Sequence, residues 1–191
     1  MYLKKVDIKE FKKVIFKEYK KIFPRLERKF YMTLKKSYNH NKTDFIEIIA
    51  EDQFVGFIIT NFKKDNPYVQ LEYIAILEKY RNKGYGTNAI KLLKELYKEH
   101  EGIFIEIEKV GQGNSDEENK IRQKREGFYE KLGFCELGFD LELYKIIYST
   151  FILPCTKNEI SDEKAIKYFF EIYNETLGKR RVKKNYKILK R

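Results

Sequence analysis

The spacing of apolar positions near the N-terminus predicts two helices after a short edge strand at 1–5. Asp7 stands three residues before Glu10, as in a capping box, and apolar residues at helical spacing follow them. Pro24 should end that helix or open the next one. The second helix is expected over 25–38. Its apolar residues stand four apart, at Leu26, Phe30, Leu34 and Tyr38.

The middle of the chain changes to the pattern of a sheet. Three runs rich in β-branched and aromatic residues lie within 45–77, separated by turn residues, and predict an antiparallel meander. An amphipathic helix over 86–99 then leads to another apolar run at 103–110. Because strand–helix–strand connections are almost always right-handed crossovers, 69–77 and 103–110 should be parallel neighbours.

The last third of the chain predicts two more helices around a strand pair. A polar loop is expected over 111–119, followed by a short helix over 120–132 that ends at Gly133. Two β-rich runs within 134–153 predict the strand pair, and 161–177 predicts a final amphipathic helix.

The whole pattern predicts one mixed α/β domain at 1–155, a helical extension at 156–178 and a basic tail at 179–191. Hydrophobic residues make up 42% of the 191 residues, as a globular domain with its own core requires. No apolar run approaches the ~20 residues needed to cross a bilayer. The N-terminus lacks the apolar core of a signal peptide. We therefore expect a cytoplasmic protein with no membrane contact.

Residues that bind metals or form disulfides are few. Cys135 and Cys155 are expected to be reduced thiols in that compartment, and neither belongs to a CxxC pair. The two histidines, His40 and His100, do not complete a zinc ligand set. We therefore expect no metal cofactor.

The net charge of +11 is concentrated at the C-terminus. Residues 179–191 contain eight Lys or Arg and no acidic residue, so 1–178 is only mildly basic. Such a tail can bind nucleic acid or another polyanion without sequence preference. A solvated, poorly ordered terminus is the simpler interpretation, and we favour it.

The turn between the third strand and the helix that follows carries the most specific chemistry. Gly84 and Gly86 stand at the start of the helix, where backbone amides and the helix dipole form an anion site, and Arg81 and Lys83 add positive charge. An ordinary strand–helix turn explains the spacing equally well. The segment lacks the GxxxxGK[ST] pattern of a P-loop and the GxGxxG pattern of a dinucleotide fold.

Two segments resemble the GNAT superfamily of N-acetyltransferases. "RNKGYG", from Arg81 to Gly86, is similar to the R/Q-x-x-G-x-G/A signature that binds acetyl-CoA. "FYEKLGF", from Phe128 to Phe134, is similar to a second GNAT signature, and the two stand in the family's order. The resemblance covers roughly 1–153. It implies a central mixed sheet with an antiparallel meander and a splayed parallel strand pair, flanked by helices.

The resemblance also implies a coenzyme site. The amides of 82–87 would hold the pyrophosphate, and the backbone of 74–76 would pair with the pantetheine arm as an added strand. A strand amide near Ile74 would polarise the thioester carbonyl in the gap between the parallel strands. The residues expected at acetyl-CoA are Ile74, Ala75, Ile76, Arg81, Asn82, Lys83, Gly84, Tyr85, Gly86 and Thr87.

The base that deprotonates the attacking amine is expected on the strand that carries the thioester. Glu72 precedes Ile74 by two residues, and simple alternation places both on one face unless a bulge interrupts the strand. A surface carboxylate paired with a lysine is the alternative interpretation. Glu106, Glu108 or a water molecule could act as the base instead.

Tyr129, in the second signature, is expected to protonate the leaving thiolate. Core packing beside Phe128 is its alternative role. The sequence departs from the family at one position. Many members carry an asparagine seven residues before the tyrosine, where this chain has Arg122, and Asn114 and Asn119 do not match that spacing.

The acceptor is expected to be a primary amine, on a small molecule or a peptide. Aromatic residues of the first two helices shape its pocket or belong to the core: Phe16, Phe23, Phe30, Tyr31 and Tyr38. Two other functions stay open, a non-catalytic CoA-binding module and an RNA-directed acetyltransferase that uses the basic tail. The helix 161–177 packs on the domain or forms a homodimer.

Overall fold

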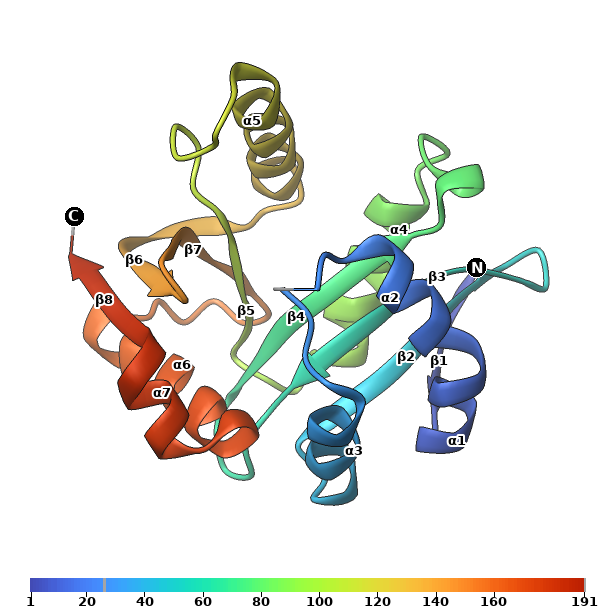
Figure 1. Ribbon diagram of the computed structural model, residues 1–191, viewed down its shortest axis with the longest axis horizontal. Helices are drawn as coiled ribbons and strands as arrows, with labels where there is room; N and C mark the ends of the chain where they lie inside the picture. Colours follow the sequence, from blue (N-terminus) through green and yellow to red (C-terminus); the bar gives the residue numbers. More distant parts are fainter. Residues whose placement is uncertain (26, 191) are drawn as a thin grey trace.

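A computed structural model describes residues 1–25 and 27–190, so the expected helical position of Leu26 lies outside the described residues. One mixed sheet runs through the molecule in the order β1-β2-β3-β4-β5-β7-β6-β8 (Figure 1). The strands are β1 Tyr2–Val6, β2 Thr43–Ala50, β3 Gln53–Asn61, β4 Tyr68–Ile76, β5 Gly102–Glu108, β6 Cys135–Leu143, β7 Ile146–Pro154 and β8 Tyr186–Lys190. The helices are α1 Ile8–Glu10, α2 Phe16–Ile22, α3 Tyr31–Asn39, α4 Tyr85–Leu96, α5 Asp116–Lys131, α6 Asp162–Leu177 and α7 Lys179–Asn185.

The first half of the sheet is the predicted meander, with β1 added at its edge. β1 pairs with β2, β2 with β3 and β3 with β4, all antiparallel. Glu51 and Asp52 form the β2–β3 turn, and both have positive φ, at 50° and 54°. Two residues of positive φ are typical of a type I′ hairpin turn, whose twist matches that of the strands.

The first helix begins as the sequence predicts, and the second does not. The Asp7 side chain accepts hydrogen bonds from the amides of Lys9 and Glu10, and α1 continues through a π-helical segment at Phe11–Ile15 into α2. The prediction that the next helix starts at residue 25 is wrong, because α3 begins at Tyr31. The amide of Lys29 donates to the Tyr19 hydroxyl at 2.7 Å, and this tertiary contact replaces a helical hydrogen bond.

The predicted parallel pair of β4 and β5 exists, but it is short. Only Tyr68–Gln70 pairs with Gly102–Phe104, and the two strands splay apart beyond these residues. After β5, the helix α5 is longer than predicted. Ser115 caps it by accepting a hydrogen bond from the Glu118 amide, so 116–119 belong to the helix and not to a loop. Gly133 follows it with φ 88°, as expected of a C-terminal glycine.

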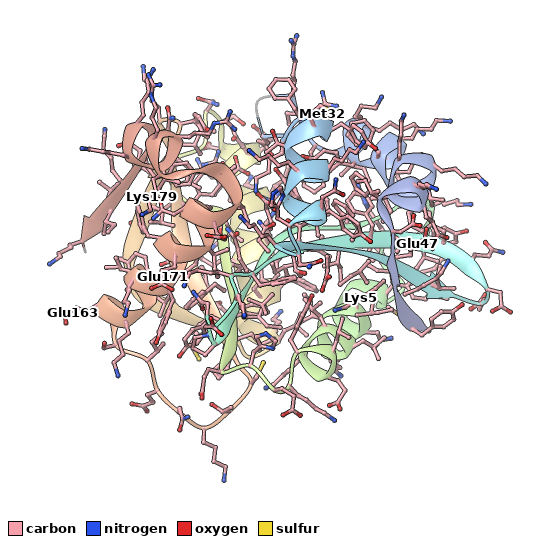
Figure 2. All side chains as sticks on the ribbon, turned by 90° about the horizontal axis from the view of Figure 1, so that it is seen from below. Lys5, Met32, Glu47, Glu163, Glu171 and Lys179 are labelled. Carbon is pink, nitrogen blue, oxygen red and sulfur yellow. The ribbon has the colours of Figure 1, made fainter. Side chains whose placement is uncertain are left out.

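The C-terminal segment folds onto the sheet. α6 matches the predicted helix 161–177 and packs on β5, β6 and β7. The favoured prediction of a poorly ordered tail is wrong: α7 starts at Lys179 (Figure 2), and β8 then pairs with β6. Val182 and Tyr186 explain the order, because both side chains are buried beside α6. A nucleic-acid contact by the basic side chains of this segment stays a prediction.

Helices cover both faces of the sheet. The helices from α1 to α3 pack on one face of β2, β3 and β4, and α6 and α7 cover the same face over β5, β6 and β7. Side chains of α4 and α5 pack on the opposite face. No helix within the described residues has the length and apolar character to cross a membrane. The cytoplasmic location stays a prediction, and so do the domain boundaries and the homodimer.

Candidate active site

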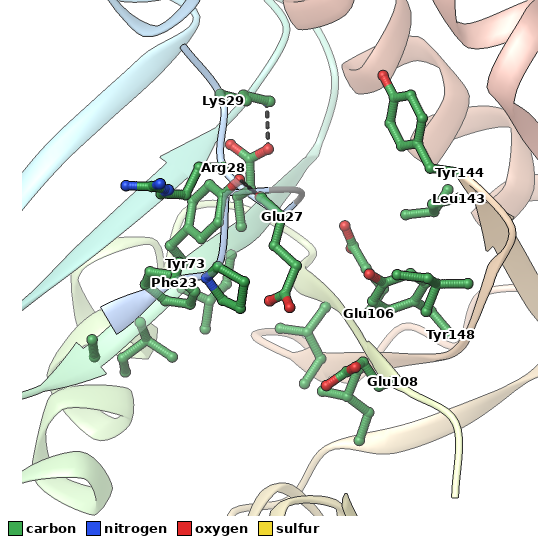
Figure 3. Close-up of a pocket in the computed structure, with 18 of the residues that line it drawn as sticks. Phe23, Glu27, Arg28, Lys29, Tyr73, Glu106, Glu108, Leu143, Tyr144 and Tyr148 are labelled. Atoms are coloured by element: carbon green, nitrogen blue, oxygen red, sulfur yellow. Dashed lines mark hydrogen bonds and ion pairs between the residues drawn. The ribbon is translucent and has the colours of Figure 1, made fainter. Parts of the chain in front are cut away.

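A cleft of about 1010 Å³ opens where β4 and β5 part. Its two inner walls are 71–76 of β4 and 105–108 of β5. Residues 22–25 and 27–30 cover one side, and residues of α6, α7, β8 and the β6–β7 hairpin line the far side. Figure 3 shows side chains from the segment before α3, from β4, from β5 and from the β6–β7 hairpin around one space. Four regions distant in sequence therefore build one cavity.

A β-bulge in β4 sets the directions of its side chains. Ile59 of β3 lies opposite Tyr73 and the next residue, Thr60, lies opposite Leu71, so Glu72 is the extra residue. Leu71 packs in the same core as Ile74 beneath α4, whereas Tyr73 packs on the other face with α2. The prediction of simple alternation along this strand is therefore wrong at Glu72.

Glu72 lines the cleft with its charge already paired. Its carboxylate forms an ion pair with Lys29, drawn as a dashed line in Figure 3, and accepts a hydrogen bond from Asn61 Nδ2 at 2.8 Å. Its side chain is 9% exposed, so solvent screens this pair only weakly. The alternative interpretation, a carboxylate paired with a lysine, matches this geometry, although the pair lies inside the cleft.

Glu106 lies in the cleft on β5 and accepts hydrogen bonds from two side chains. Gln70 Nε2 donates to its two oxygens at 2.9 and 3.2 Å, and the hydroxyl of Tyr173 donates to Oε1. Burial raises the pKa of Glu106 to about 7, and the charge of Glu72 raises it as well, while the two hydrogen bonds act in the opposite direction. A carboxylate with such a pKa exchanges its proton near neutral pH.

Two further carboxylates face the same space (Figure 3). Glu108 is paired with Arg122 at 3.0 Å and with Arg125 at 3.1 Å. Glu27, from the loop before α3, has its pKa raised by burial and then by the charge of Glu108. Carboxylates and basic side chains therefore share this side of the cleft, because its lining also holds Arg25, Arg28, Lys29, Arg125 and Arg181.

Tyr129 projects from α5 into the cleft. Its ring packs between Phe128 and Phe134, with centroid distances of 5.2 Å to each. Burial raises the pKa of its hydroxyl to about 12, so the proton is present at neutral pH. The hydroxyl forms no hydrogen bond with the rest of the described chain. It is therefore available to donate to a ligand in the cleft.

A second hollow of about 370 Å³ surrounds the turn before α4. Gly84 ends the turn with φ 78° and Asn82 has φ 62°, so the chain bends sharply into the helix. The first amides of α4 have no hydrogen-bond partners within the helix. They point out of its N-terminal end, where the hollow lies. The lining residues are Ile76, Tyr80, Arg81, Asn82, Gly84, Tyr85, Gly86, Thr87 and Phe128.

The two hollows share Ile76 and Arg81, so the turn and the cleft form one continuous surface. Ile74 and Ala75 line the cleft next to them, and β4 has no strand partner on its β5 side beyond Gln70. Lys83, which the sequence predicts at the coenzyme, lines neither hollow. Its ammonium lies 5.8 Å from the centre of the Tyr80 ring.

The position of the family's asparagine is taken by a buried structural arginine. Arg122 donates to the carbonyl of Lys109 at 3.1 Å and pairs with Glu118 at 2.5 Å, and it does not line the cleft. Asn119 accepts from the amides of Gly111 and Gly113 and so holds the preceding loop.

Only part of the expected acceptor pocket comes from the aromatic residues of the first helices. Phe23 and Phe30 line the cleft, and Phe16, Tyr31 and Tyr38 pack in the core beneath them. The sequence analysis did not identify several residues that line the cleft or bond to its carboxylates. They are Glu27, Lys29, Gln70, Tyr148, Tyr173 and Tyr186. No local signal marks Tyr173, which meets a carboxylate 67 positions away.

No group of three or more potential metal ligands occurs among residues 1–25 and 27–190. The donor set of the cleft is instead a mixture of carboxylates, arginines and tyrosines.

Comparisons with solved structures place the fold among acetyltransferases. A Bacteroides thetaiotaomicron protein assigned to the GNAT acetyltransferases superposes with a TM-score of 0.72 at 18% identity, covering 93% of this chain and 99% of that one. A variant of the Vibrio cholerae spermidine N-acetyltransferase gives a TM-score of 0.60 at 13% identity and 82% and 96% coverage. A Bacillus anthracis protein assigned as a streptothricin acetyltransferase, solved with acetyl-coenzyme A, gives 0.50 at 25% identity and 69% and 72% coverage.

A comparison with curated protein sequences finds no match. The family model described as "Acetyltransferase (GNAT) family" matches residues 12–134, which is more than half of the chain and includes both the turn before α4 and Tyr129. The chain therefore belongs to the GNAT family of acetyltransferases.

Proposed function

We propose that the protein transfers the acetyl group of acetyl-CoA to a primary amine by direct attack in a ternary complex. The observation that carries this proposal is the continuity of the two hollows. The N-terminus of α4, which is suited to bind an anion, and Glu106, whose pKa is about 7, line two hollows that share Ile76 and Arg81.

The coenzyme would lie along β4. Its pyrophosphate would accept hydrogen bonds from the amides of 82–87, with Arg81 adding charge. The pantetheine arm would pair with Ile74, Ala75 and Ile76 on the strand edge that β5 leaves free. The thioester would then reach the level of the bulge, between Tyr129 and Glu106.

The reaction would need one base and one acid. Glu106 would take a proton from the ammonium form of the acceptor, and the amine nitrogen would then attack the thioester carbon. As the nitrogen–carbon bond forms and the carbon–sulfur bond breaks, the thiolate would receive a proton from Tyr129. The attacking nitrogen, now positively charged, would release its second proton through solvent to the Tyr129 oxygen, which leaves the neutral amide, the free thiol and protonated Tyr129. Glu106 suits the base role better than Glu72, because its pKa is about 7, whereas the carboxylate of Glu72 forms an ion pair with Lys29.

The acceptor would be a small cationic amine. Glu27 and Glu106 form no ion pair with a basic side chain among the described residues, so their carboxyl groups would receive the ammonium group (Figure 3). The structural neighbours named for spermidine and streptothricin act on small amines, which agrees with such an acceptor.

The test is thiol release from acetyl-CoA with a panel of diamines, polyamines, aminoglycosides and amino-acid amides. Turnover with a cationic amine, and little with neutral or acidic acceptors, is the expected result. Tight acetyl-CoA binding without turnover across the whole panel would contradict the proposal and favour a non-catalytic CoA-binding module. Absence of acetyl-CoA binding would contradict both.

A further inference from the structure

A buried chain of hydrogen bonds crosses the sheet at the closed end of the cleft. The Thr43 hydroxyl donates to Asn61 Oδ1 at 2.8 Å, and Asn61 Nδ2 donates to Gln70 Oε1 at 3.0 Å. Gln70 Nε2 then donates to Glu106. Thr43, Asn61 and Gln70 are all at most 2% exposed. The chain therefore links β2, β3, β4 and β5 beneath the active site, away from solvent.

This chain has a fixed direction. Because Thr43 occupies the Asn61 carbonyl oxygen, the Asn61 amide group faces Gln70 and Glu72, to which it donates at 3.0 and 2.8 Å. Since the Gln70 carbonyl oxygen accepts from Asn61, its amide group faces Glu106. Each side-chain amide thus donates toward a carboxylate, and reversing either one would leave buried groups unpaired.

Glu106 receives its second donor from a part of the chain that the family model does not match. Tyr173 lies in the middle of α6, is 2% exposed, and donates its hydroxyl to Glu106 Oε1. The rings of Phe169 and Tyr186 pack against it, at centroid distances of 6.2 and 4.7 Å. The family model ends at residue 134, so this contact comes from the C-terminal extension.

The extension is anchored to the first half of the sheet on both sides of this contact. Lys42 pairs with Glu175 at 2.8 Å, and Lys63 pairs with Glu171 at 3.2 Å. Asn66 Nδ2 also donates to the Tyr168 carbonyl at 3.2 Å. α6 therefore bridges the β4 and β5 halves below the splay, and Tyr173 is held in place by both.

We propose that Tyr173 and Gln70 are positioning residues that fix the carboxylate of Glu106 in the orientation and protonation state a general base needs. The C-terminal extension then completes the catalytic site instead of only covering the sheet. This inference rests on the proposed function for the identity of the base. Tyr173 acts through Glu106 and needs no contact with acetyl-CoA or the acceptor.

The physical reason is the balance of forces on Glu106. Burial and a neighbouring negative charge favour the protonated acid, and the two donated hydrogen bonds favour the carboxylate. Removing one donor tips this balance toward the acid. The titratable and charged side chains that face Glu106 from the surrounding elements are Lys29, Glu72, Tyr148, Tyr173 and Tyr186.

The first experiment compares the pH dependence of kcat/KM in the wild type and in Tyr173→Phe. The wild type should show an inflection near pH 7, the pKa of Glu106. Loss of one hydrogen bond to a charged group should move it upward by about one pH unit. The variant would then be several-fold slower at neutral pH and recover in alkaline solution. A uniform loss at every pH would indicate a structural role and overturn the inference.

Tyr68→Phe is the matched control. Tyr68 is also buried beneath α6 and stacks on Phe104, but it neither lines the cleft nor bonds to Glu106. Its variant removes a hydroxyl from the same core and should keep the wild-type inflection. An equal shift in Tyr68→Phe would show that any hydroxyl loss in this core has the same effect, and would overturn the role of Tyr173.

The second experiment needs no acceptor. In protein labelled with ¹³C at the glutamate carboxyl carbons, the Glu106 signal is identified by its absence in Glu106→Gln and is titrated by NMR. Its midpoint should lie near pH 7 in the wild type and higher in Tyr173→Phe. An unchanged midpoint would overturn the inference even in an active enzyme. A shifted midpoint without any acetyl transfer would instead locate the failure in the proposed function.

Discussion

The two ends of the cleft are built by different means. At the α4 end, the turn 81–87 gathers backbone amides and two positive φ angles within one short stretch of chain. At the other end, Glu106 meets Gln70 and Tyr173, side chains that come from three separate elements. The first end is suited to an anion and is exposed. The second carries carboxylates, is largely buried and is held by tertiary contacts.

This difference separates binding from chemistry. A change in the turn should weaken coenzyme binding without altering the base. Among the described residues, no hydrogen bond joins the turn to the buried hydrogen-bond chain that runs from Thr43 to Glu106. A change at Glu106 should slow the reaction and leave coenzyme affinity intact. Variants at the two ends can therefore test the separation directly.

Glu106→Gln should have the largest effect. Without a base, kcat/KM should fall by about 10²–10⁴-fold, the range of general acid–base catalysis. Thiol-release kinetics measure this loss, and calorimetry should give an acetyl-CoA Kd close to that of the wild type. Glu142→Gln is the control, because Glu142 lies on β6 outside the cleft and pairs with Lys187. Near-normal turnover of Glu106→Gln would return the base role to Glu72 or to water.

Gly86→Asp should abolish most coenzyme binding. A carboxylate a few ångströms from the pyrophosphate should weaken acetyl-CoA binding by about 100-fold or more. The fold should tolerate the change, since a Cβ at this position meets Phe128 no closer than 3.5 Å. Titration calorimetry measures the Kd. Gly127→Asp adds the same charge in open space on α5 and should bind normally. Equal affinities in both variants would remove the turn from the coenzyme site.

The burial of Glu106 should also appear in the stability of the protein. Its pKa is raised from the ordinary 4.5 to about 7, so the folded chain holds this proton more tightly than the unfolded chain. The stabilisation is complete below pH 4.5 and is lost as the pH rises through 7. Relative to Glu106→Gln, the wild type should lose about 3 kcal/mol of unfolding free energy across this window.

Urea denaturation of both proteins at acid and alkaline pH measures that difference. Taking the wild type minus Glu106→Gln removes the contribution of the other titrating groups, which the two proteins share. A difference that stays constant with pH would mean that Glu106 titrates near its ordinary value.

Tyr129→Phe should have the smallest effect of the four. The hydroxyl would contribute one charge-assisted hydrogen bond to the leaving thiolate, so kcat should fall by about tenfold. The acetyl-CoA Kd should not change, because the ring still packs between Phe128 and Phe134. Single-turnover kinetics at saturating acetyl-CoA isolate this step. An unaltered rate would assign Tyr129 to packing alone.

The sequence predicts the turn and helix at the α4 end well because the signals for them are local. Gly84, Gly86 and the amphipathic pattern of α4 lie side by side in the chain, and the strand pattern before them is regular. The same holds for the sheet elements and for the cap at Asp7. Local patterns give wrong predictions where tertiary contacts decide the conformation. At Lys29, the backbone amide donates to the Tyr19 hydroxyl, and α3 starts later in the chain than predicted.

The acceptor end could not be predicted from the sequence. The bulge at Glu72 depends on the register of β3 against β4, and alternation alone gives the wrong face. The partner of Glu106 depends on where α6 docks, and the order of the basic tail depends on burying Val182 and Tyr186 beside that helix. A charge count shows eight basic residues there and predicts solvation, because it ignores the apolar residues between them.

The most direct test of the account is a crystal structure of the protein grown with acetyl-CoA. We expect the pyrophosphate at the amides of 82–87, the pantetheine arm along β4 beyond Gln70, and the thioester between Tyr129 and Glu106. A coenzyme bound elsewhere, or one whose thioester lies away from both side chains, would contradict the assignment of this cleft as the active site.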